Sequence, residues 1–465
     1  MPRLASAPPL SPTDSPLFGW IACFLIGLPV GLDFEIVGRI TGIELLFLML
    51  VPAGAFSAGL SQVTGPVWRL LVLSILWFLA QLVSDLINGT EFGNLMRGSA
   101  RALITAILIL GYFLTVRDDL LRLTALLIGL AVGLLIGFVY EPSDYAIDMP
   151  WKFGYGMSVT MFIIAAATIF WYFRKVPAAI FLCFLASALN FFEGYRSMAG
   201  ISFMSGVLIA IPAFTAPSVR RRSNAILIIA GFALVLSAAG ITRLYSYAAL
   251  GGLLGAEEED KYRFQVGALG VLLSGRSEIM VSSQAIIDRP LFGHGSWASN
   301  SDYAYMLLEL SGAESVDSAA VTSDLIPSHS HLFGAWVEGG VLAALFWFYV
   351  LALLARAMTT ILSRDDLVNP LVAFSMMNLA WALFFSPYGL TNRALSCVGI
   401  VAAVTVQRLA ARSSGSDPAP QMPGKPLVPN VGLAGHGVPV GGGRDAMIPG
   451  GPTDLVARRD DAGHV

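Results

Sequence analysis

Long apolar runs separated by short polar segments make up most of the chain. A helix needs roughly 20 mostly apolar residues to cross about 30 Å of hydrocarbon, and about twelve runs approach or reach that length. They extend approximately over residues 17–32, 40–60, 67–87, 100–116, 121–140, 155–173, 176–192, 197–216, 224–241, 332–360, 370–385 and 394–411. This pattern predicts an all-α, polytopic integral membrane protein with about twelve transmembrane helices.

The longest polar stretch, residues 242–331, separates the ninth run from the tenth. Within it, residues 276–288 predict a short helix that ends before Pro290, and residues 303–310 predict a second one. The sequence GHG at 293–295 marks a turn between them. The acidic run EEED at 257–260 indicates a solvated segment, with a metal site as the alternative.

The orientation of the helices follows from the positions of the basic residues. If the N-terminus is cytoplasmic, alternation of the runs places most basic residues of the short loops on the cytoplasmic side, as the positive-inside rule requires. These residues are Arg117, Arg122, Arg174, Lys175, Arg220, Arg221, Arg222, Arg356, Arg364, Arg408 and Arg412. We therefore expect a cytoplasmic segment 1–16, a transmembrane domain 17–411 that includes a large periplasmic loop 242–331, and a Gly/Pro-rich, disordered cytoplasmic tail 412–465.

Composition narrows the function classes. Of 465 residues, 56% are hydrophobic and 13% are charged, which is far too apolar for an ordinary soluble protein. The net charge is −3 and no basic stripe is interleaved with aromatic residues, so we expect no nucleic-acid partner. All three cysteines fall inside apolar runs, which excludes a disulfide framework or a zinc spacing.

Candidate chemistry gathers at the predicted outer ends of the helices. Three of the five histidines, His294, His329 and His331, lie at the end of the long loop or near it. Five arginines fall on the outer side, where the positive-inside rule disfavours them: Arg39, Arg97, Arg196, Arg276 and Arg393. Any one of them can be explained by snorkelling to lipid phosphate, but five on one face favour a binding role.

Carboxylates also gather near the predicted outer ends of the helices. Glu44, Asp85, Glu193 and Glu338 lie near predicted outer helix ends, while the centres of the runs carry almost no charge. A transporter is expected to carry charged groups near the membrane midplane, so this distribution favours an enzyme with a shallow outward cavity. Asp33 and Glu35, in the first outer loop, are either a solvated pair or the metal ligands of a competing mechanism.

Three motifs resemble those of the O-antigen ligase and O-antigen or exopolysaccharide polymerase family of bacterial inner-membrane proteins. They are YRSMAG from Tyr195, GRSEI from Gly275 followed by DRPLFGHGSW from Asp288, and SHSHLFGAWVEGGVL from Ser328. The last is similar to the family pattern of a histidine followed by Asn, Ser or Gln, nine residues and then glycine, met here by His329, Ser330 and Gly340. Tyr195 stands where serine is common in the family. The resemblance is specific only over residues 195–200 and 275–341.

The resemblance implies a metal-independent, inverting membrane glycosyltransferase without a cofactor, which acts at the periplasmic face of the inner membrane. Its donor would be an undecaprenyl-diphosphate-linked glycan and its acceptor another glycan, in polymerisation of repeat units, or lipid A core, in ligation. Other polysaccharide-assembly proteins would be its partners in the membrane. A lipid-linked oligosaccharide transporter is the alternative from another class.

Roles for single residues follow from the resemblance and from chemistry. His329 would be the catalytic base, since imidazole is neutral near pH 7; its alternative is a cap on the next helix or a bond within the loop. Arg196, Arg276 and Arg393 would hold the donor diphosphate, because planar guanidinium groups bind phosphate in a bidentate manner. His331 would contact substrate. Outside this list, His294 would line the substrate site or be structural, and Glu338 would orient a histidine or bond within the bundle.

Overall fold

The protein is predominantly helical in a computed structural model, which describes residues 16–36, 38–54, 57–215, 247, 251, 277–311 and 324–413. The only sheet within these ranges is a two-stranded antiparallel pair, β1 (Asp33–Glu35) and β2 (Arg39–Thr41). The α-helices with defined bounds are α1 (Pro16–Gly27), α2 (Gly42–Leu50), α3 (Pro66–Asn88), α4 (Phe92–Val116), α5 (Leu120–Tyr140), α6 (Asp144–Asp148), α7 (Gly156–Tyr172), α8 (Val176–Phe192), α9 (Arg196–Phe214), α14 (Ser277–Asp288), α15 (Ser301–Ser311), α16 (His331–Ser363), α17 (Pro370–Phe385) and α18 (Leu390–Ser413).

The helices confirm an all-α membrane architecture. Seven helical segments of the described chain are long and apolar enough to cross a bilayer: α3, α4, α5, the segment Pro150–Tyr172 that contains α7, α9, α16 and α18. Three shorter apolar segments accompany them: Pro16–Gly31, α8 and α17. With 17 residues, α8 is only about 25 Å long at 1.5 Å per residue. The predicted run at 224–241 lies outside the described residues, and the total of about twelve stays a prediction.

One predicted span differs from the structure. The apolar run at 40–60 forms the nine-residue helix α2, a turn at 51–54 and a short 3-10 helix, Ser57–Gln62. Nine residues cover only about 14 Å, roughly half of the hydrocarbon thickness. The helix ends because Pro52 has no backbone N–H to continue it and Gly54 adopts a positive φ of 73°. This run is therefore not a single membrane-crossing helix.

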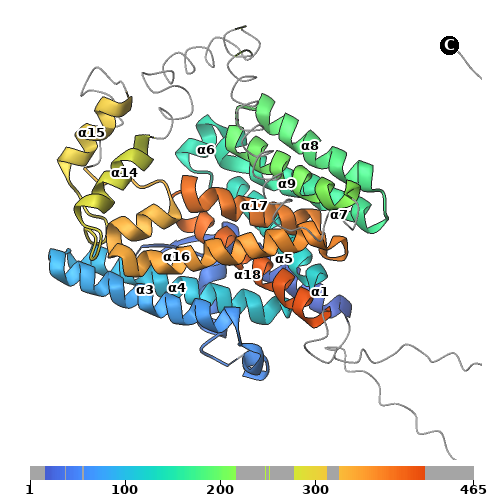
Figure 1. Cartoon of the computed structure of the whole chain (residues 1–465), viewed down its shortest axis with the longest axis horizontal. Helices are drawn as coiled ribbons and strands as arrows, with labels where there is room; N and C mark the ends of the chain where they lie inside the picture. Colours follow the sequence, from blue (N-terminus) through green and yellow to red (C-terminus); the bar gives the residue numbers. More distant parts are fainter. Residues whose placement is uncertain are drawn as a thin grey trace, which may run out of the picture. The chain divides into compact units, whose positions relative to one another are not determined.

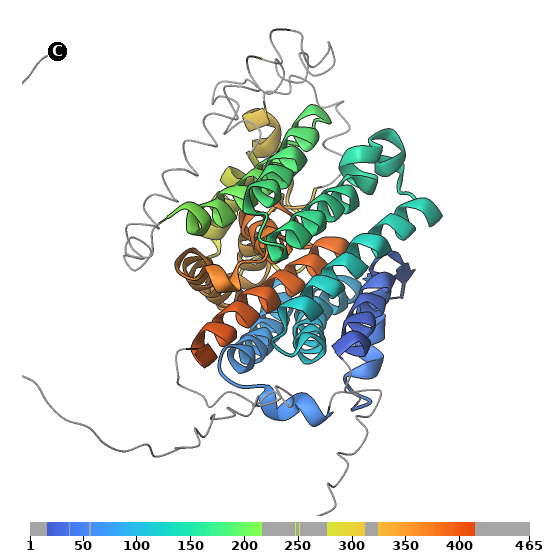
Figure 2. The same ribbon diagram turned by 90° about the vertical axis from the view of Figure 1, so that its right-hand side faces the viewer.

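The core is formed around α16, α17 and α18. Figures 1 and 2 show these helices between the α3–α4 pair and the group of α7, α8 and α9, and α16 packs against both α3 and α18. The largest fully buried side chains include Trp347, Tyr112, Phe47 and Phe346. In a bilayer, such packing and the satisfaction of polar groups hold helices together, because lipid is as apolar as the side chains.

Helix ends separate into two groups, as alternating spans require. At one end, Asp118, in the turn between α4 and α5, accepts hydrogen bonds from Arg408 (2.8 Å) and Arg412 (2.6 Å) near the end of α18. Asn369, which caps α17, donates to Thr124 of α5 (2.9 Å) at this same end. The opposite end gathers the end of α3, the start of α4 and the start of α16, together with α14 and α15. Which end faces the periplasm stays a prediction.

Both short helices predicted within the long loop are present in the structure. Helices α14 and α15 lie close to residues 276–288 and 303–310, where the pattern predicts them. They form a small apolar cluster with the first part of α16, built from Val281, Ala285, Ile286, Tyr303, Ile326 and Val337. The described part of the long loop is thus packed onto the helix bundle.

Helices α1 and α5 approach each other closely. Three glycines of α5 recur every four residues, at 129, 133 and 137. A Cβ atom placed on Gly129 would lie 2.1 Å from the carbonyl oxygen of Phe24 in α1, so no larger residue fits there. Small residues at this spacing are typical of membrane helices whose backbones touch.

Candidate functional site

Helix α16 is broken at Gly340, nine residues after its start. Gly340 has φ 72° and ψ −171°, a backbone conformation open in practice only to glycine. A Cβ there would lie 2.0 Å from the carbonyl oxygen of Leu291. Ser330 caps the first segment of the helix by accepting a hydrogen bond from the N–H of Phe333 (3.1 Å). The motif spacing therefore marks the two ends of a short half-helix, residues 331–339.

The loop 288–297 fills this break. The N–H groups of His294 and Gly295 donate to the carbonyls of Val337 (2.7 Å) and Glu338 (3.0 Å), which the break leaves without partners in their own helix. In return, the N–H of Val341 donates to the carbonyl of Pro290 (3.0 Å). Two of the three sequence motifs are thus joined by backbone hydrogen bonds.

A buried carboxylate fastens the same loop to α3. Asp85 is 1% exposed and accepts hydrogen bonds from the N–H (2.6 Å) and the hydroxyl (2.8 Å) of Ser296. The amide of Gln81 donates to the Ser296 hydroxyl (2.8 Å). Both carboxylate oxygens have donors, which offsets the high cost of a charge at this depth.

A second polar cluster holds the loop against α14 and α15. Tyr303 donates to Asp288 (2.6 Å), which lowers the pKa of this carboxyl, while burial raises the pKa of Tyr303 to about 12. The Nε2 atom of His294 lies 2.8 Å from the carbonyl oxygen of Ala285, and burial lowers the pKa of His294. His294 is thus a structural residue that fixes the turn.

A cavity of about 290 Å³ opens between the loop, the half-helix and the segment 387–389 that precedes α18. Its charged residues are Arg101 of α4 and Glu338 of α16, which form an ion pair. The guanidinium of Arg101 also lies 4.3 Å from the ring centroid of Trp297, in a cation–π contact. Trp77 and Tyr388 supply further aromatic surface.

His331 forms part of the cavity wall and is fully buried. Its Nδ1 lies 2.8 Å from the carbonyl oxygen of Ser386, and its Nε2 lies 2.7 Å from the hydroxyl of Ser396. A carbonyl only accepts, so Nδ1 carries a proton, and the neutral ring can accept from Ser396 at Nε2. The rings of Trp347 and Tyr388 contact it and each other, with centroids 4.7–5.0 Å apart. Both nitrogens of His331 are engaged within the bundle, so the hydrogen bonds of this histidine are structural in this conformation.

His329 lies beside the cavity rather than in its wall. The chain before α16 is extended, so successive side chains point to opposite sides, and Ser328 and Ser330 face the cavity. The His329 side chain is 56% exposed, and its Nδ1 lies 3.4 Å from a carboxylate oxygen of Glu278 on α14. A carboxylate near Nδ1 favours the tautomer with the proton there, which leaves Nε2 as the basic atom. The second and third sequence motifs, GRSEI and SHSHLFGAWVEGGVL, meet in this histidine–glutamate pair.

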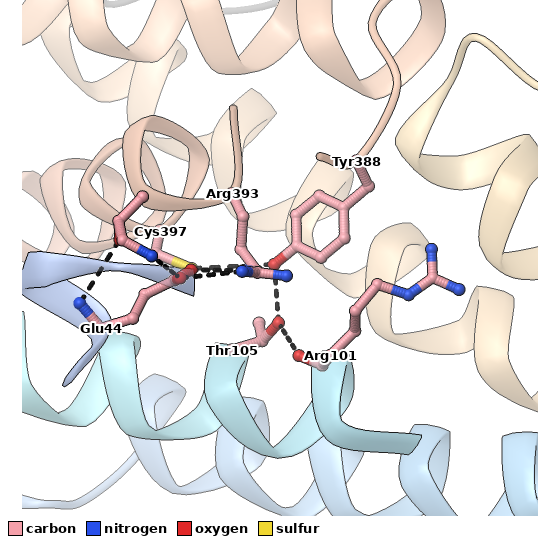
Figure 3. Close-up of polar contacts among 7 residues, drawn as sticks. Glu44, Arg101, Thr105, Tyr388, Arg393 and Cys397 are labelled. Atoms are coloured by element: carbon pink, nitrogen blue, oxygen red, sulfur yellow. Dashed lines mark hydrogen bonds and ion pairs between the residues drawn. The ribbon is translucent and has the colours of Figure 1, made fainter. Parts of the chain in front are cut away.

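Arg393 is engaged elsewhere in the bundle. Its guanidinium forms a two-pronged ion pair with Glu44 of α2, one arm of which measures 2.8 Å (Figure 3). Glu44 is fully buried and also accepts from the N–H of Thr41 in a capping box. The Arg101 side chain extends away from this pair (Figure 3). Arg393 therefore anchors α18 to α2 in this structure.

The other two predicted diphosphate ligands are only partly described. Arg196 is the first residue of α9 and is half-buried. Arg276 lies outside the described residues, directly before Ser277, where α14 begins. The structure does not bring Arg196 into the wall of the cavity.

Sequence reasoning missed Arg101 and the aromatic walls. Glu338 bonds within the bundle, one of its two predicted roles, but its partner Arg101 is 237 residues away in the chain. The signal available was a cation inside an apolar run, which requires a buried counter-charge or a polar cavity. Trp77, Trp297 and Tyr388 resemble ordinary interfacial aromatics in the sequence.

The acidic residues of the competing metal hypothesis lie apart from the cavity. Asp33 pairs with Arg39 (3.2 Å) across the β1–β2 hairpin, and burial raises the pKa of Asp33 although Arg39 opposes this shift. Within the described ranges, no three His, Cys, Asp or Glu side chains are grouped to hold a metal ion. The run at 257–260 lies outside these ranges.

Fold and site together define an all-helical membrane protein with a polar, aromatic cavity at one set of helix ends. Comparisons of the chain with protein-family models, with curated proteins and with solved structures give no match.

Proposed function

We propose that this protein is a glycosyltransferase of the bacterial inner membrane that uses an undecaprenyl-diphosphate-linked saccharide as donor on the periplasmic side. The observation that carries the proposal is the His329–Glu278 pair beside the cavity. It joins a candidate base to an orienting carboxylate at the end of an apolar helix bundle, where a lipid-linked substrate would present its sugar.

In the proposed reaction, Nε2 of His329 removes the proton of an acceptor sugar hydroxyl. The hydroxyl oxygen attacks the anomeric carbon of the donor, the bond between this carbon and the phosphate oxygen breaks, and its electron pair leaves with undecaprenyl diphosphate. Attack from the face opposite the leaving group inverts the anomeric configuration. The proton remains on His329, and Glu278 stabilises the imidazolium that forms.

Negative charge develops on the departing diphosphate, and we assign its stabilisation to Arg196 and Arg276. Guanidinium groups remain charged and bind phosphate oxygens with two parallel hydrogen bonds. Arg276 directly precedes α14, which carries Glu278, so the same short segment would bring a base partner and a phosphate ligand to one place. Lysine in place of Arg276 keeps the charge but not the paired donors, so Arg276→Lys is expected to fail nearly as badly as Arg276→Ala.

Polymerisation of repeat units is the preferred reaction, and transfer to lipid A core is its alternative. We prefer an enzyme to a transporter because Asp85 and Glu338 lie only about one and two turns from helix ends, about 5 and 11 Å at 1.5 Å per residue, short of a midplane at about 15 Å. Deleting the gene and analysing lipid-linked intermediates separates the three. Single repeats accumulate if a polymerase is lost, lipid-linked polymer accumulates if a ligase is lost, and export stops earlier if a transporter is lost.

The role of His329 is tested in the same strain by complementation. His329→Ala is expected to reach the membrane but to reduce polysaccharide formation by about 100-fold or more, the usual contribution of a general base. Asp302→Ala, an exposed substitution at the start of α15, is the matched control and should complement fully. Normal polysaccharide with His329→Ala would overturn the assignment of the base, and normal polysaccharide after gene deletion would overturn the function.

A further inference from the structure

The cavity has both signs of charge and no excess of either. Among the described residues, Arg101 and Glu338 are the charged residues of its wall, and they pair with each other. His331 also lies in the wall and could carry a positive charge, but its hydrogen bonds suit the neutral ring. An anionic ligand would meet the Glu338 carboxylate, and a cationic ligand would meet the Arg101 guanidinium.

Aromatic rings complete the wall. Trp77, Trp297 and Tyr388 line the cavity around the ion pair. A sugar ring has an apolar C–H face that packs against such rings, and an edge of hydroxyls that can both donate and accept. At about 290 Å³ the cavity lies at the lower end of the range for small-molecule sites, which suits one sugar ring better than a longer segment of glycan.

We propose that this cavity is a subsite for a single uncharged sugar ring, with neighbouring hydroxyls hydrogen-bonded to the Arg101–Glu338 ion pair. This inference rests on the proposed function for the source of the sugar, which is a residue of the lipid-linked glycan. The cavity would recognise the sugar, whereas the diphosphate would bind elsewhere, because the Glu338 carboxylate would repel it in the cavity. Hexuronates are excluded for the same electrostatic reason.

The test measures protection of a cysteine in the cavity wall. Ser328→Cys in the purified full chain is alkylated by a maleimide, with and without a panel of methyl glycosides of neutral hexoses and of hexuronates. At about four times its Kd, a neutral glycoside should slow alkylation about fivefold. Ser301→Cys, exposed at the start of α15, is the control and should be unaffected. The cysteines already present are buried.

Charge selectivity gives the second readout. Glu338→Gln leaves the charge of Arg101 uncompensated, so in this background a hexuronate should protect Ser328→Cys more strongly than a neutral sugar. Equal protection of the original cavity by hexuronates, or no protection by any neutral glycoside, would overturn the proposal. Since protection does not require transfer, a negative result here is distinct from the failure of the proposed function, which the gene deletion decides.

Discussion

Gly340→Ala should destabilise the broken helix strongly, and its cost can be worked from the geometry. A side chain at φ 72° and ψ −171° costs about 1–3 kcal/mol in backbone strain. The added Cβ would lie 2.0 Å from the carbonyl oxygen of Leu291, so the loop 288–297 must move away. This movement breaks three backbone hydrogen bonds, each worth about 1 kcal/mol. We expect a loss of about 5 kcal/mol in the free energy that holds the loop in place.

The assay is thermal unfolding of the purified protein in detergent, followed by tryptophan fluorescence. Gly93→Ala is the matched control, because nothing lies within 4 Å of its added Cβ, and alanine within a helix stabilises by about 0.5–1 kcal/mol relative to glycine. Gly340→Ala should lower the unfolding midpoint by several degrees, and Gly93→Ala should not. A midpoint within about 1 °C of the original protein would refute the reasoning, since it would show that α16 can run straight through residue 340.

Three further variants test the contacts of the site. Glu278→Gln removes the carboxylate beside His329 and should reduce glycosyl transfer about tenfold or more without preventing membrane insertion, as measured by complementation and membrane fractionation. Arg393→Lys loses the two-pronged contact with Glu44 and should lower the free energy of unfolding by about 2 kcal/mol, as measured by thermal unfolding. His294 has a lowered pKa, so the unfolded chain takes up its proton first as pH falls below about 6.5; stability should therefore drop between pH 7 and pH 5.5, and less so in His294→Gln.

Each of these variants has its own opposing outcome. Full transfer activity with Glu278→Gln would show that the histidine works without the carboxylate. An unchanged midpoint with Arg393→Lys would mean that charge alone holds α18 against α2. A pH dependence that persists in full in His294→Gln would assign it to another group; the Asp288 carboxyl is not a candidate, because its lowered pKa lies below this pH range.

Most of the helices could be predicted from the sequence because each apolar run carries its own signal. The failure at residues 40–60 is also local in origin, since Pro52 and Gly54 end the helix within a run that hydropathy treats as continuous. The first loop helix can be predicted because Pro290 marks its end without reference to the rest of the chain.

Residues of the site could be predicted from the sequence only where they lie close together in one segment of the chain. His329 and Gly340 belong to one segment, and the structure gives their spacing a reason, the half-helix between them. The ion pair of Arg101 with Glu338 joins positions 237 residues apart, and no local pattern reveals such a partner. The two histidines differ because His329 belongs to the segment before the helix and its side chain is exposed, whereas His331 is the first residue of α16 and is packed into the bundle.

The short helix α8 has a consequence for the membrane around it. At about 25 Å it is shorter than a typical hydrocarbon layer of about 30 Å, so lipids beside it must thin or its flanking residues must reach outward. The turn that follows α8 leads directly to Arg196 at the start of α9. Local thinning would lower the plane of lipid phosphates toward this arginine. Hydrophobic mismatch would thus favour entry of a diphosphate-linked lipid at this edge of the bundle.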